Sequence, residues 1–172
     1  NSRKRMDDLA DQIVATRSAR GPSDPPDLLD LLIEAHSVGT LDALEVRNNL
    51  LGFLFAGHET TALSLTWALY LLALHPEVQD RVRAEVRAVC GDRAPSIDDV
   101  PQLTLTRQVV DETLRLYPPA GFLTRTARVD DVLAGHKVRA GATVILPVYA
   151  LHRHAQLWDA PNQFDPSRFA PE

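Results

Sequence analysis

The segment Ala56-Gly57-His58-Glu59-Thr60-Thr61 places groups that could do chemistry in the middle of an apolar stretch. A carboxylic acid among apolar side chains costs free energy unless it has a partner or a function. Glu59 beside a hydroxyl group could pass protons inward. Ala56 and Gly57 leave a bare patch of backbone on which a flat ligand could lie. On this segment alone the alternative stays open: a buried helix with an incidental glycine and a glutamate that reaches solvent.

Two further segments combine charge with an unusual setting. Glu112-Thr113-Leu114-Arg115 spaces an acid and a base by three residues, so on a helix they share a face and can pair. The alternative is an ordinary surface pair that adds a few tenths of a kcal/mol. The closing segment, residues 158–169, is rich in aromatic residues and proline, and it holds Arg168 between apolar neighbours. Such an arginine usually meets a carboxylate, and Glu112 is a candidate.

A long helix must position the first of these segments. Asp42 is a plausible N-cap with Glu45 three residues later, and Pro76 ends the helical pattern after His75. A helix from Asp42 to His75 would be about 50 Å long. Its apolar residues surround the whole helix between residues 63 and 74, which predicts a central, buried helix.

The remaining pattern predicts shorter helices and a small sheet. Helices are expected at Arg3–Ala19, Asp27–Ala35, Pro76–Cys90, from Ser96, and at Gln102–Leu116. Strands are expected at Phe122–Val129, Val132–Val138 with Ala134-Gly135 as turn residues, and Thr143–Val148. From Trp158 onward we expect ordered coil. The fold class is therefore mainly α: a long central helix in a helical bundle, with a small β-sheet.

Composition excludes several classes of protein. The 172 residues carry a formal net charge of −5 and are 45% hydrophobic and 24% charged, as globular domains are. No basic run exists that could neutralise phosphates, so nucleic acid is not an expected partner. The single cysteine, Cys90, excludes an internal disulfide and a cysteine-based zinc site.

Taken together, in this order and spacing, the three segments resemble the cytochrome P-450 family, the haem-thiolate monooxygenases. Residues 56–61 look like the oxygen-binding stretch of the family's long central helix. Glu112-x-x-Arg115 looks like its Glu-x-x-Arg motif, and residues 164–169 look like its Pro-x-Arg-Phe segment. The resemblance covers residues 40–172 well, and the whole chain is expected to be one partial P-450 domain.

The resemblance implies roles for individual residues. Thr60 would be the alcohol that steadies dioxygen at the haem, and Glu59 the acid that helps to deliver protons. Ala56 and Gly57 would face the distal side of the haem, and Arg125 would pair with a haem propionate. A structural triad behind the haem would consist of Glu112, Arg115 and Arg168. The residues that would line the substrate pocket are Phe53, Ala120, Gly121, Phe122 and Leu123.

The sequence departs from the family at the iron ligand. The family's cysteine lies in a Phe-x-x-Gly-x-Arg-x-Cys-x-Gly loop downstream of the Arg-Phe segment, and the chain stops at Glu172 before any such loop. Cys90 stands at a helix end with none of the loop's residues around it. We therefore expect no metal ligand within the chain, and we expect the chain to be an internal piece of a longer enzyme, without its N-terminal part.

The implied enzyme would bind haem b, activate dioxygen and insert one oxygen atom into a small apolar substrate. Its electrons would come from a ferredoxin or a flavoprotein reductase. It would be cytoplasmic if bacterial, although a membrane anchor before Asn1 stays open.

Three alternatives remain beside this interpretation. The chain could be a truncated, inactive remnant or a helical binding protein without haem chemistry. A membrane helix over residues 48–74 would carry His58 and Glu59 at its centre, at a cost of a few kcal/mol. A metal site could use His152 and His154 with His136, although residues two apart do not share a helix face.

Overall fold

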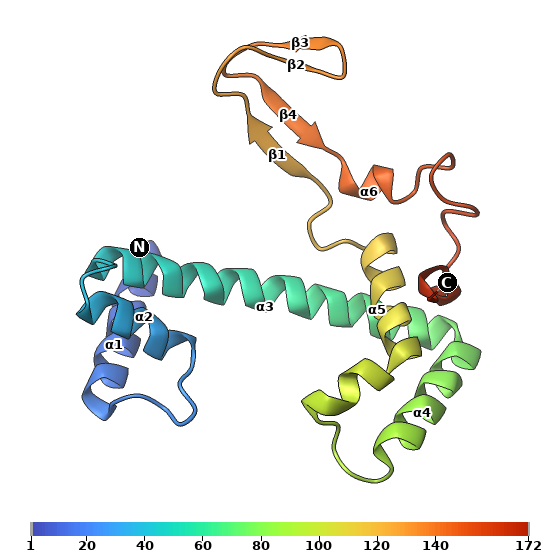
Figure 1. Ribbon diagram of the computed structural model, residues 1–172, viewed down its shortest axis with the longest axis horizontal. Coiled ribbons are helices and arrows are strands. Elements are labelled where there is room, and N and C mark those ends of the chain that lie inside the picture. Colours follow the sequence, from blue (N-terminus) through green and yellow to red (C-terminus); the bar gives the residue numbers. More distant parts are fainter. Residues whose placement is uncertain (1, 172) are drawn as a thin grey trace. The chain divides into compact units, whose positions relative to one another are not determined.

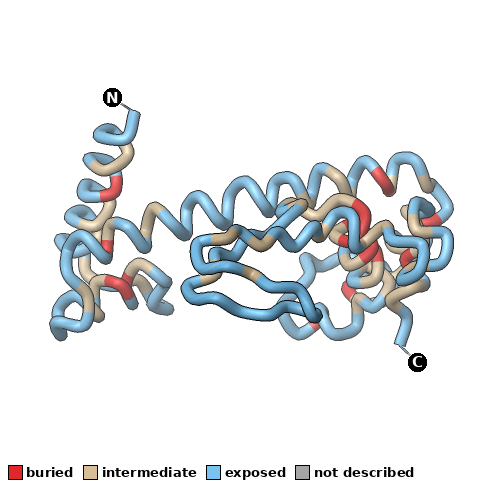
Figure 2. The backbone as a smooth tube through the Cα atoms, turned by 90° about the horizontal axis from the view of Figure 1, so that it is seen from above, coloured by how far each residue is buried: buried red, intermediate tan, exposed pale blue. Residues whose placement is uncertain are grey.

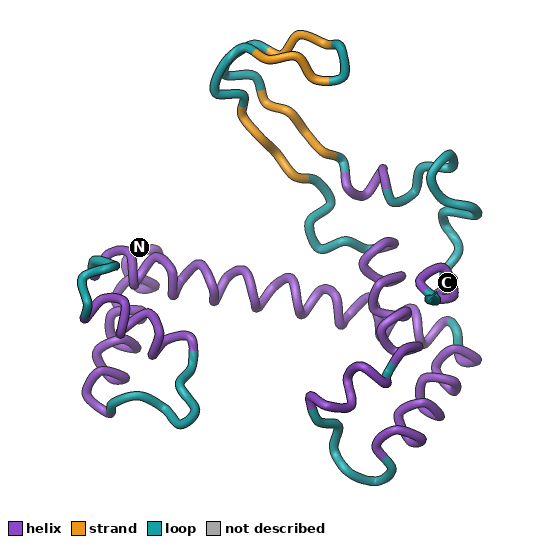
Figure 3. The backbone as a smooth tube through the Cα atoms, in the orientation of Figure 1, coloured by secondary structure: helices purple, strands orange, loops and turns teal. Residues whose placement is uncertain are grey.

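The computed structural model describes residues 2–171, of which most are helical (Figures 1 and 3). It contains two compact units, residues 1–59 and 60–172, and the long helix α3 (Ala43–Leu74) has its beginning in the first unit and its end in the second.

The first unit contains α1 (Ser2–Arg20), α2 (Leu28–Ser37) and the beginning of α3. One guanidinium nitrogen of Arg17 binds Asp27 at 2.8 Å and Asp30 at 2.9 Å, so the end of α1 is held against the start of α2. Asp27 caps α2 and accepts hydrogen bonds from the Leu29 and Asp30 amides. Hydrogen bonds from Ser23, and then from Asp27 and Arg17, hold the pKa of Asp30 well below its usual range.

The start of α3 confirms the expected capping box. The Asp42 amide donates to the Glu45 carboxylate at 2.8 Å, and the Glu45 amide donates to the Asp42 carboxylate at 2.7 Å. These two bonds satisfy amides that the helix itself leaves unpaired. The helix ends at Leu74, one residue before the expected His75, because Pro76 prevents its continuation.

The second unit contains the end of α3 and the helices α4 (Pro76–Cys90) and α5 (Thr104–Leu116), with the 3₁₀ helix η1 (Ile97–Gln102) between them. Four short strands, β1 (Leu123–Thr126), β2 (Asp131–Leu133), β3 (His136–Val138) and β4 (Thr143–Leu146), follow. The chain then forms α6 (Val148–Leu151) and a second 3₁₀ helix, η2 (Pro166–Phe169), which packs against α5. The buried side chains of this unit concentrate on α5, where Val109, Thr113 and Leu116 lie beside the charged cluster described below.

The sheet differs from the expected one in two ways. β1 pairs with β4 and β2 pairs with β3, both antiparallel, which gives two separate two-stranded ribbons instead of one sheet. The segment expected as one strand, Val132–Val138, is a hairpin that turns at Ala134 and Gly135, whose φ angles are +48° and +83°. Two consecutive positive φ angles produce the tight turn that suits a twisted ribbon.

The end of the chain also corrects two expectations. The last strand stops at Leu146, and Pro147 is the N-cap of α6, where the strand was expected to continue to Val148. Residues 166–169 form η2 instead of coil, since Asp165 caps it by accepting a hydrogen bond from the Ser167 amide.

The expectation that α3 is buried on every side is wrong for this structure. Val46 and Leu71 are its buried residues, whereas Phe55, Leu65 and Leu69 are each about 60% exposed or more, and most of the α3 tube has the colour of exposed residues (Figure 2). An exposed apolar area of this kind is typical of a surface that another segment or molecule covers.

Candidate functional site

The centre of the second unit is a buried ion pair on α5. Arg115 Nε donates to Glu112 Oε2 at 2.6 Å, and Arg115 Nη2 donates to Glu112 Oε1 at 2.8 Å. The two side chains are 1% and 0% exposed. Their spacing of three residues puts them on one face of the helix. Because a buried charge needs a partner, burial makes this bidentate pairing essential.

The remaining donors of Arg115 hold the chain that follows α6. Nη1 donates to the carbonyl oxygens of His152 and Pro161, both at 2.7 Å, and Nη2 donates to that of Gln163 at 3.1 Å. The guanidinium also lies 5.0 Å from the centre of the Trp158 ring. One side chain of α5 thus fixes the path of residues 152–163.

Arg168 completes the cluster from η2. Its Nε lies 3.5 Å from Glu112 Oε1, and its Nη2 donates to the Ala160 carbonyl at 3.1 Å. The Asp165 amide donates to the same Glu112 oxygen at 2.9 Å. The structure therefore brings Glu112, Arg115 and Arg168 together, as three charges of which two are positive.

Asp165 adds a negative charge near this cluster. A hydrogen bond from the Ser167 hydroxyl lowers the pKa of Asp165 below its usual range, and the charges of Arg168 and Arg115 lower it further. Asp165 is not among the site residues expected from the sequence. The signal that could have found it is the Asp-Pro-Ser order, in which an acid caps a short helix.

The segment expected to meet dioxygen lies on α3. The boundary between the two units falls inside this segment, after Glu59 and before Thr60. The positions are exposed at Ala56, Gly57, Glu59 and Thr60. A side-chain carbon built on Gly57 would meet no atom within 4 Å, so this stretch of α3 presents open space beside bare backbone. Further along, the Ser64 hydroxyl donates to the Thr60 carbonyl at 2.8 Å, and the Thr66 hydroxyl donates to the Ala62 carbonyl at 2.7 Å. Hydroxyl bonds of this kind weaken and bend a helix.

The expected pocket residues fall in both units. Phe53 is 46% exposed on α3 in the first unit. In the second unit, the segment between α5 and β1 holds Ala120, Gly121 and Phe122, and Leu123 is the first residue of β1. Phe122 is 65% exposed. Their place in a pocket stays a prediction.

Arg125 has the chemistry to hold a carboxylate of a cofactor. Arg125 is exposed on β1 and donates one hydrogen bond from Nη1, to the Thr124 carbonyl at 2.8 Å. Because a guanidinium has five N–H donors, several can still serve a carboxylate. Cys90 is buried at the end of α4, and residues 2–171 contain no group of three or more His, Cys, Asp or Glu side chains that could hold a metal ion.

Two alternatives from the sequence can be placed in the structure. His152 Nδ1 faces the Arg115 carbonyl at 3.2 Å, so this ring contributes to the contact between α6 and α5. Among the described residues, none of the helices has the combination of length and hydropathy that a bilayer requires.

The sequence model of the Cytochrome P450 family matches residues 1–172. The chain belongs to the cytochrome P450 family. The solved structure of a zebrafish cytochrome P450 with progesterone superposes with a TM-score of 0.89 and 32% identity, over 97% of this chain and 42% of that one. The P450 fold expected from the sequence is therefore confirmed.

Several bacterial P450 relatives are similar over nearly the whole chain. Cyclooctatin synthase of Streptomyces melanosporofaciens is 38% identical over 98% of this chain and 37% of its own length. Cyclooctat-9-en-7-ol 5-monooxygenase of the same organism is 38% identical over 96% and 36%. Putative cytochrome P450 132 of Mycobacterium tuberculosis is 36% identical over 94% and 35%. The chain thus spans between a third and two fifths of the length of these P450s.

Proposed function

We propose that this chain belongs to a haem-thiolate monooxygenase that inserts one oxygen atom from dioxygen into an apolar organic substrate. The observation that carries the proposal is the buried cluster of Glu112, Arg115 and Arg168 in a chain that matches the P450 family from residue 1 to residue 172. Relatives named as a synthase and a monooxygenase support the same reaction class.

In this proposal haem supplies the oxidising chemistry, and the chain supplies position and protons. Glu59 places a carboxyl group on α3, and the Thr60 hydroxyl lies next to it in the sequence. A positioned acid contributes about 10²–10⁴-fold to the rate of a proton-transfer step. Gly57 and Ala56 leave room for the flat group, and Arg125 holds one of its carboxylates in place.

The charged cluster has a structural role in this proposal. Arg115 ties α5 to residues 152–163 through three backbone carbonyls, and Arg168 ties η2 to the same carboxylate. Loss of the cluster would therefore remove haem binding before it changes the reaction.

The substrate class follows from the chemistry of the segment at residues 120–123 and of Phe53. Phe53, Phe122 and Leu123 offer apolar contact and no charge, which favours a hydrocarbon-rich substrate with few polar groups. The name of the Streptomyces relative describes an unsaturated alcohol as its substrate, and the zebrafish structure contains progesterone. Electrons would arrive from a ferredoxin or a flavoprotein reductase.

The first experiment is to sequence the coding DNA on both sides of the segment. A reading frame that continues into a Phe-x-x-Gly-x-Arg-x-Cys-x-Gly loop supplies the thiolate that residues 2–171 do not provide. A stop codon directly after Glu172 would contradict the proposal and favour a helical protein without haem chemistry.

The complete reading frame then allows a direct test. The purified protein should give the red-shifted Soret band of a reduced, carbon-monoxide-bound haem thiolate, and should form products heavier by one oxygen atom. Glu59→Gln should slow product formation by about 10²-fold or more, whereas Glu77→Gln, on the exposed start of α4, should leave it unchanged. Thr60→Ala should lower the product formed per dioxygen consumed, and Thr60→Ser, which keeps the hydroxyl, should restore it.

A further inference from the structure

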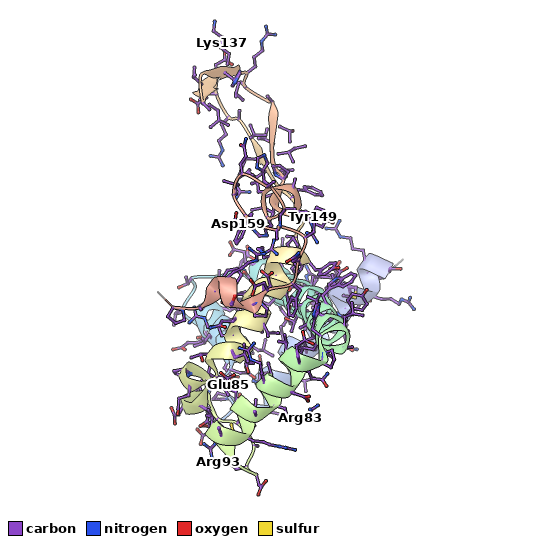
Figure 4. The ribbon with its side chains drawn as sticks, turned by 90° about the vertical axis from the view of Figure 1, so that its right-hand side faces the viewer. Arg83, Glu85, Arg93, Lys137, Tyr149 and Asp159 are labelled. Atoms are coloured by element: carbon purple, nitrogen blue, oxygen red, sulfur yellow. The ribbon has the colours of Figure 1, made fainter. Side chains whose placement is uncertain are left out.

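Arg153 lies between two tyrosine rings. Its guanidinium carbon is 4.0 Å from the ring centre of Tyr149, on α6, and 5.5 Å from that of Tyr117, which caps the end of α5. Figure 4 shows Tyr149 on the short helix that precedes the closing loop. Tyr117 in turn stacks on Trp67 of α3, with ring centres 4.0 Å apart and planes within 6° of parallel.

The charge of Arg153 lacks the usual compensation. Its Nη1 is buried and has no hydrogen-bond acceptor among residues 2–171. Arg153 is half-buried, and a buried polar atom without a partner is costly. The faces of the two aromatic rings offer this cation a negative potential. The two tyrosine rings are therefore required by the cation, and the cation in turn fixes both rings.

Tyr149 connects this arrangement to the candidate pocket. Its amide donates to the Gly121 carbonyl at 2.9 Å. A side-chain carbon built on Gly121 would lie 3.8 Å from the Tyr149 side chain, so the two residues are in van der Waals contact range. Gly121 stands between Ala120 and Phe122, in the segment expected to line the pocket.

We propose that Arg153 is a positioning residue that fixes the pocket segment, residues 120–123, through Tyr149. The cation contacts the rings of Tyr149 and Tyr117, and the Tyr149 amide holds the Gly121 carbonyl. The path from the cation to the pocket segment thus consists of one ring contact and one backbone hydrogen bond. The inference rests on the proposed function for the statement that this segment faces substrate.

The test uses the complete haem-loaded protein and two readouts. The first is amide hydrogen exchange of residues 121–123. The second is the dissociation constant of 4-phenylimidazole, a haem-iron ligand with an apolar ring, followed by the Soret shift. Tyr149→Leu and Arg153→Met should each raise exchange at these amides and weaken 4-phenylimidazole binding by about tenfold, the factor expected from loss of a desolvated cation–π contact.

Conservative and matched variants separate positioning from general damage. Tyr149→Phe keeps the ring and Arg153→Lys keeps the charge, so both should stay within about threefold of the unchanged protein. Arg128→Met removes an exposed arginine from the loop after β1 and should change neither readout. The double variant Tyr149→Leu with Arg153→Met should be no worse than either single variant, since both substitutions remove the same contact.

Three results would overturn the inference. One is that the two single effects multiply in the double variant, as independent contacts would. Another is that Arg153→Met lowers the melting temperature while exchange at residues 121–123 stays unchanged. The third is that exchange rises without any change in 4-phenylimidazole binding, which would make the contact structural only. A protein that shows the expected exchange and binding changes but never oxygenates a substrate would contradict the proposed reaction and leave the positioning role intact.

Discussion

Glu112 and Arg115 form a buried pair in which each carboxylate oxygen accepts one guanidinium N–H, at 2.6 Å and 2.8 Å. The same Glu112 Oε1 accepts the Asp165 amide and faces Arg168. The carboxylate thus connects α5 to η2 and to the loop before it, across more than 50 residues of sequence. The buried charges of this site hold distant segments together, which an exposed pair on the same helix does not do.

Replacement of this carboxylate should destabilise the protein strongly. Glu112→Gln leaves two arginines in the buried cluster, and removal of one partner from a buried pair costs about 3–5 kcal/mol. The next residue provides the control, because Asp111 pairs with the exposed Arg107 at 3.7 Å. Asp111→Asn should change the free energy of unfolding by at most about 1 kcal/mol. Urea unfolding of the complete protein measures both, and equal effects of the two variants would contradict the structural role of Glu112.

Asp99 should make stability fall as the solution becomes acidic. Two hydrogen bonds from Arg93, both at 2.6 Å, and further bonds from Ser96 hold the pKa of Asp99 well below its usual range. The unfolded chain binds a proton at the ordinary Asp pKa of about 4, whereas the folded chain resists protonation until lower pH. The stabilisation is therefore complete above about pH 4 and is lost as the pH falls through that value toward the folded pKa.

The measurement compares unfolding midpoints between about pH 6 and about pH 3. Asp99→Asn should lower the unfolding midpoint at about pH 6, and it should make the midpoint less dependent on pH. Asp98→Asn changes the exposed neighbouring residue and serves as the control. Its unfolding midpoint should depend on pH as steeply as that of the unchanged protein. An identical slope in the Asp99 and Asp98 variants would show that the Arg93 contact contributes nothing.

Glu85 on α4 should determine the stability of the start of α5. Its carboxylate accepts hydrogen bonds from the Leu105 amide at 2.6 Å and the Thr106 amide at 2.9 Å, and from the hydroxyls of Thr104 and Thr106. Figure 4 labels this residue on α4. Burial raises the pKa of Glu85, but the hydrogen bonds from Leu105 and Thr106 lower it more, so the carboxylate stays charged.

The two amides belong to the first turn of α5, which has no side-chain cap of its own. Glu85→Gln should therefore lower the free energy of unfolding by about 1 kcal/mol, as loss of a helix cap does. Glu77→Gln changes the other glutamate of α4, which is exposed and pairs with His75 at 3.3 Å, and should cost less. A thermal melt of both variants decides, and a larger effect at Glu77 would contradict the capping role.

The sequence predicted local structure well where local chemistry determines it. The bounds of α4 match the expected Pro76–Cys90, since Pro76 suits a helix start and Gly91 adopts a φ of +62° after its end. The spacing of Glu112 and Arg115 likewise follows from one helix turn. These features depend on residues within four positions of each other, which a sequence pattern can report.

The parts that the sequence did not predict depend on distant contacts. The carbonyls that Arg115 binds lie 37 to 48 residues away, and Glu85 meets Leu105 across 20 residues. The ring contacts of Arg153 and the hydrogen bond between Tyr149 and Gly121 are equally non-local. The turn residues Ala134 and Gly135 were predicted correctly, but the pattern extended one strand across them, so the pairing of β2 with β3 was not predicted.

Gly57→Ala should stabilise the haem-free protein and weaken its binding of haem. A side-chain carbon at Gly57 meets no atom within 4 Å, so Gly57→Ala should stabilise α3 in the haem-free protein by about 1 kcal/mol. If a flat ligand lies on this backbone, the added methyl group should weaken haem binding by about tenfold through overpacking. Gly52 lies on the same helix with the same open space, so Gly52→Ala should give the stability gain alone. Haem titration and urea unfolding of both variants separate the two effects, and equal haem affinity in both variants would place the haem away from Gly57.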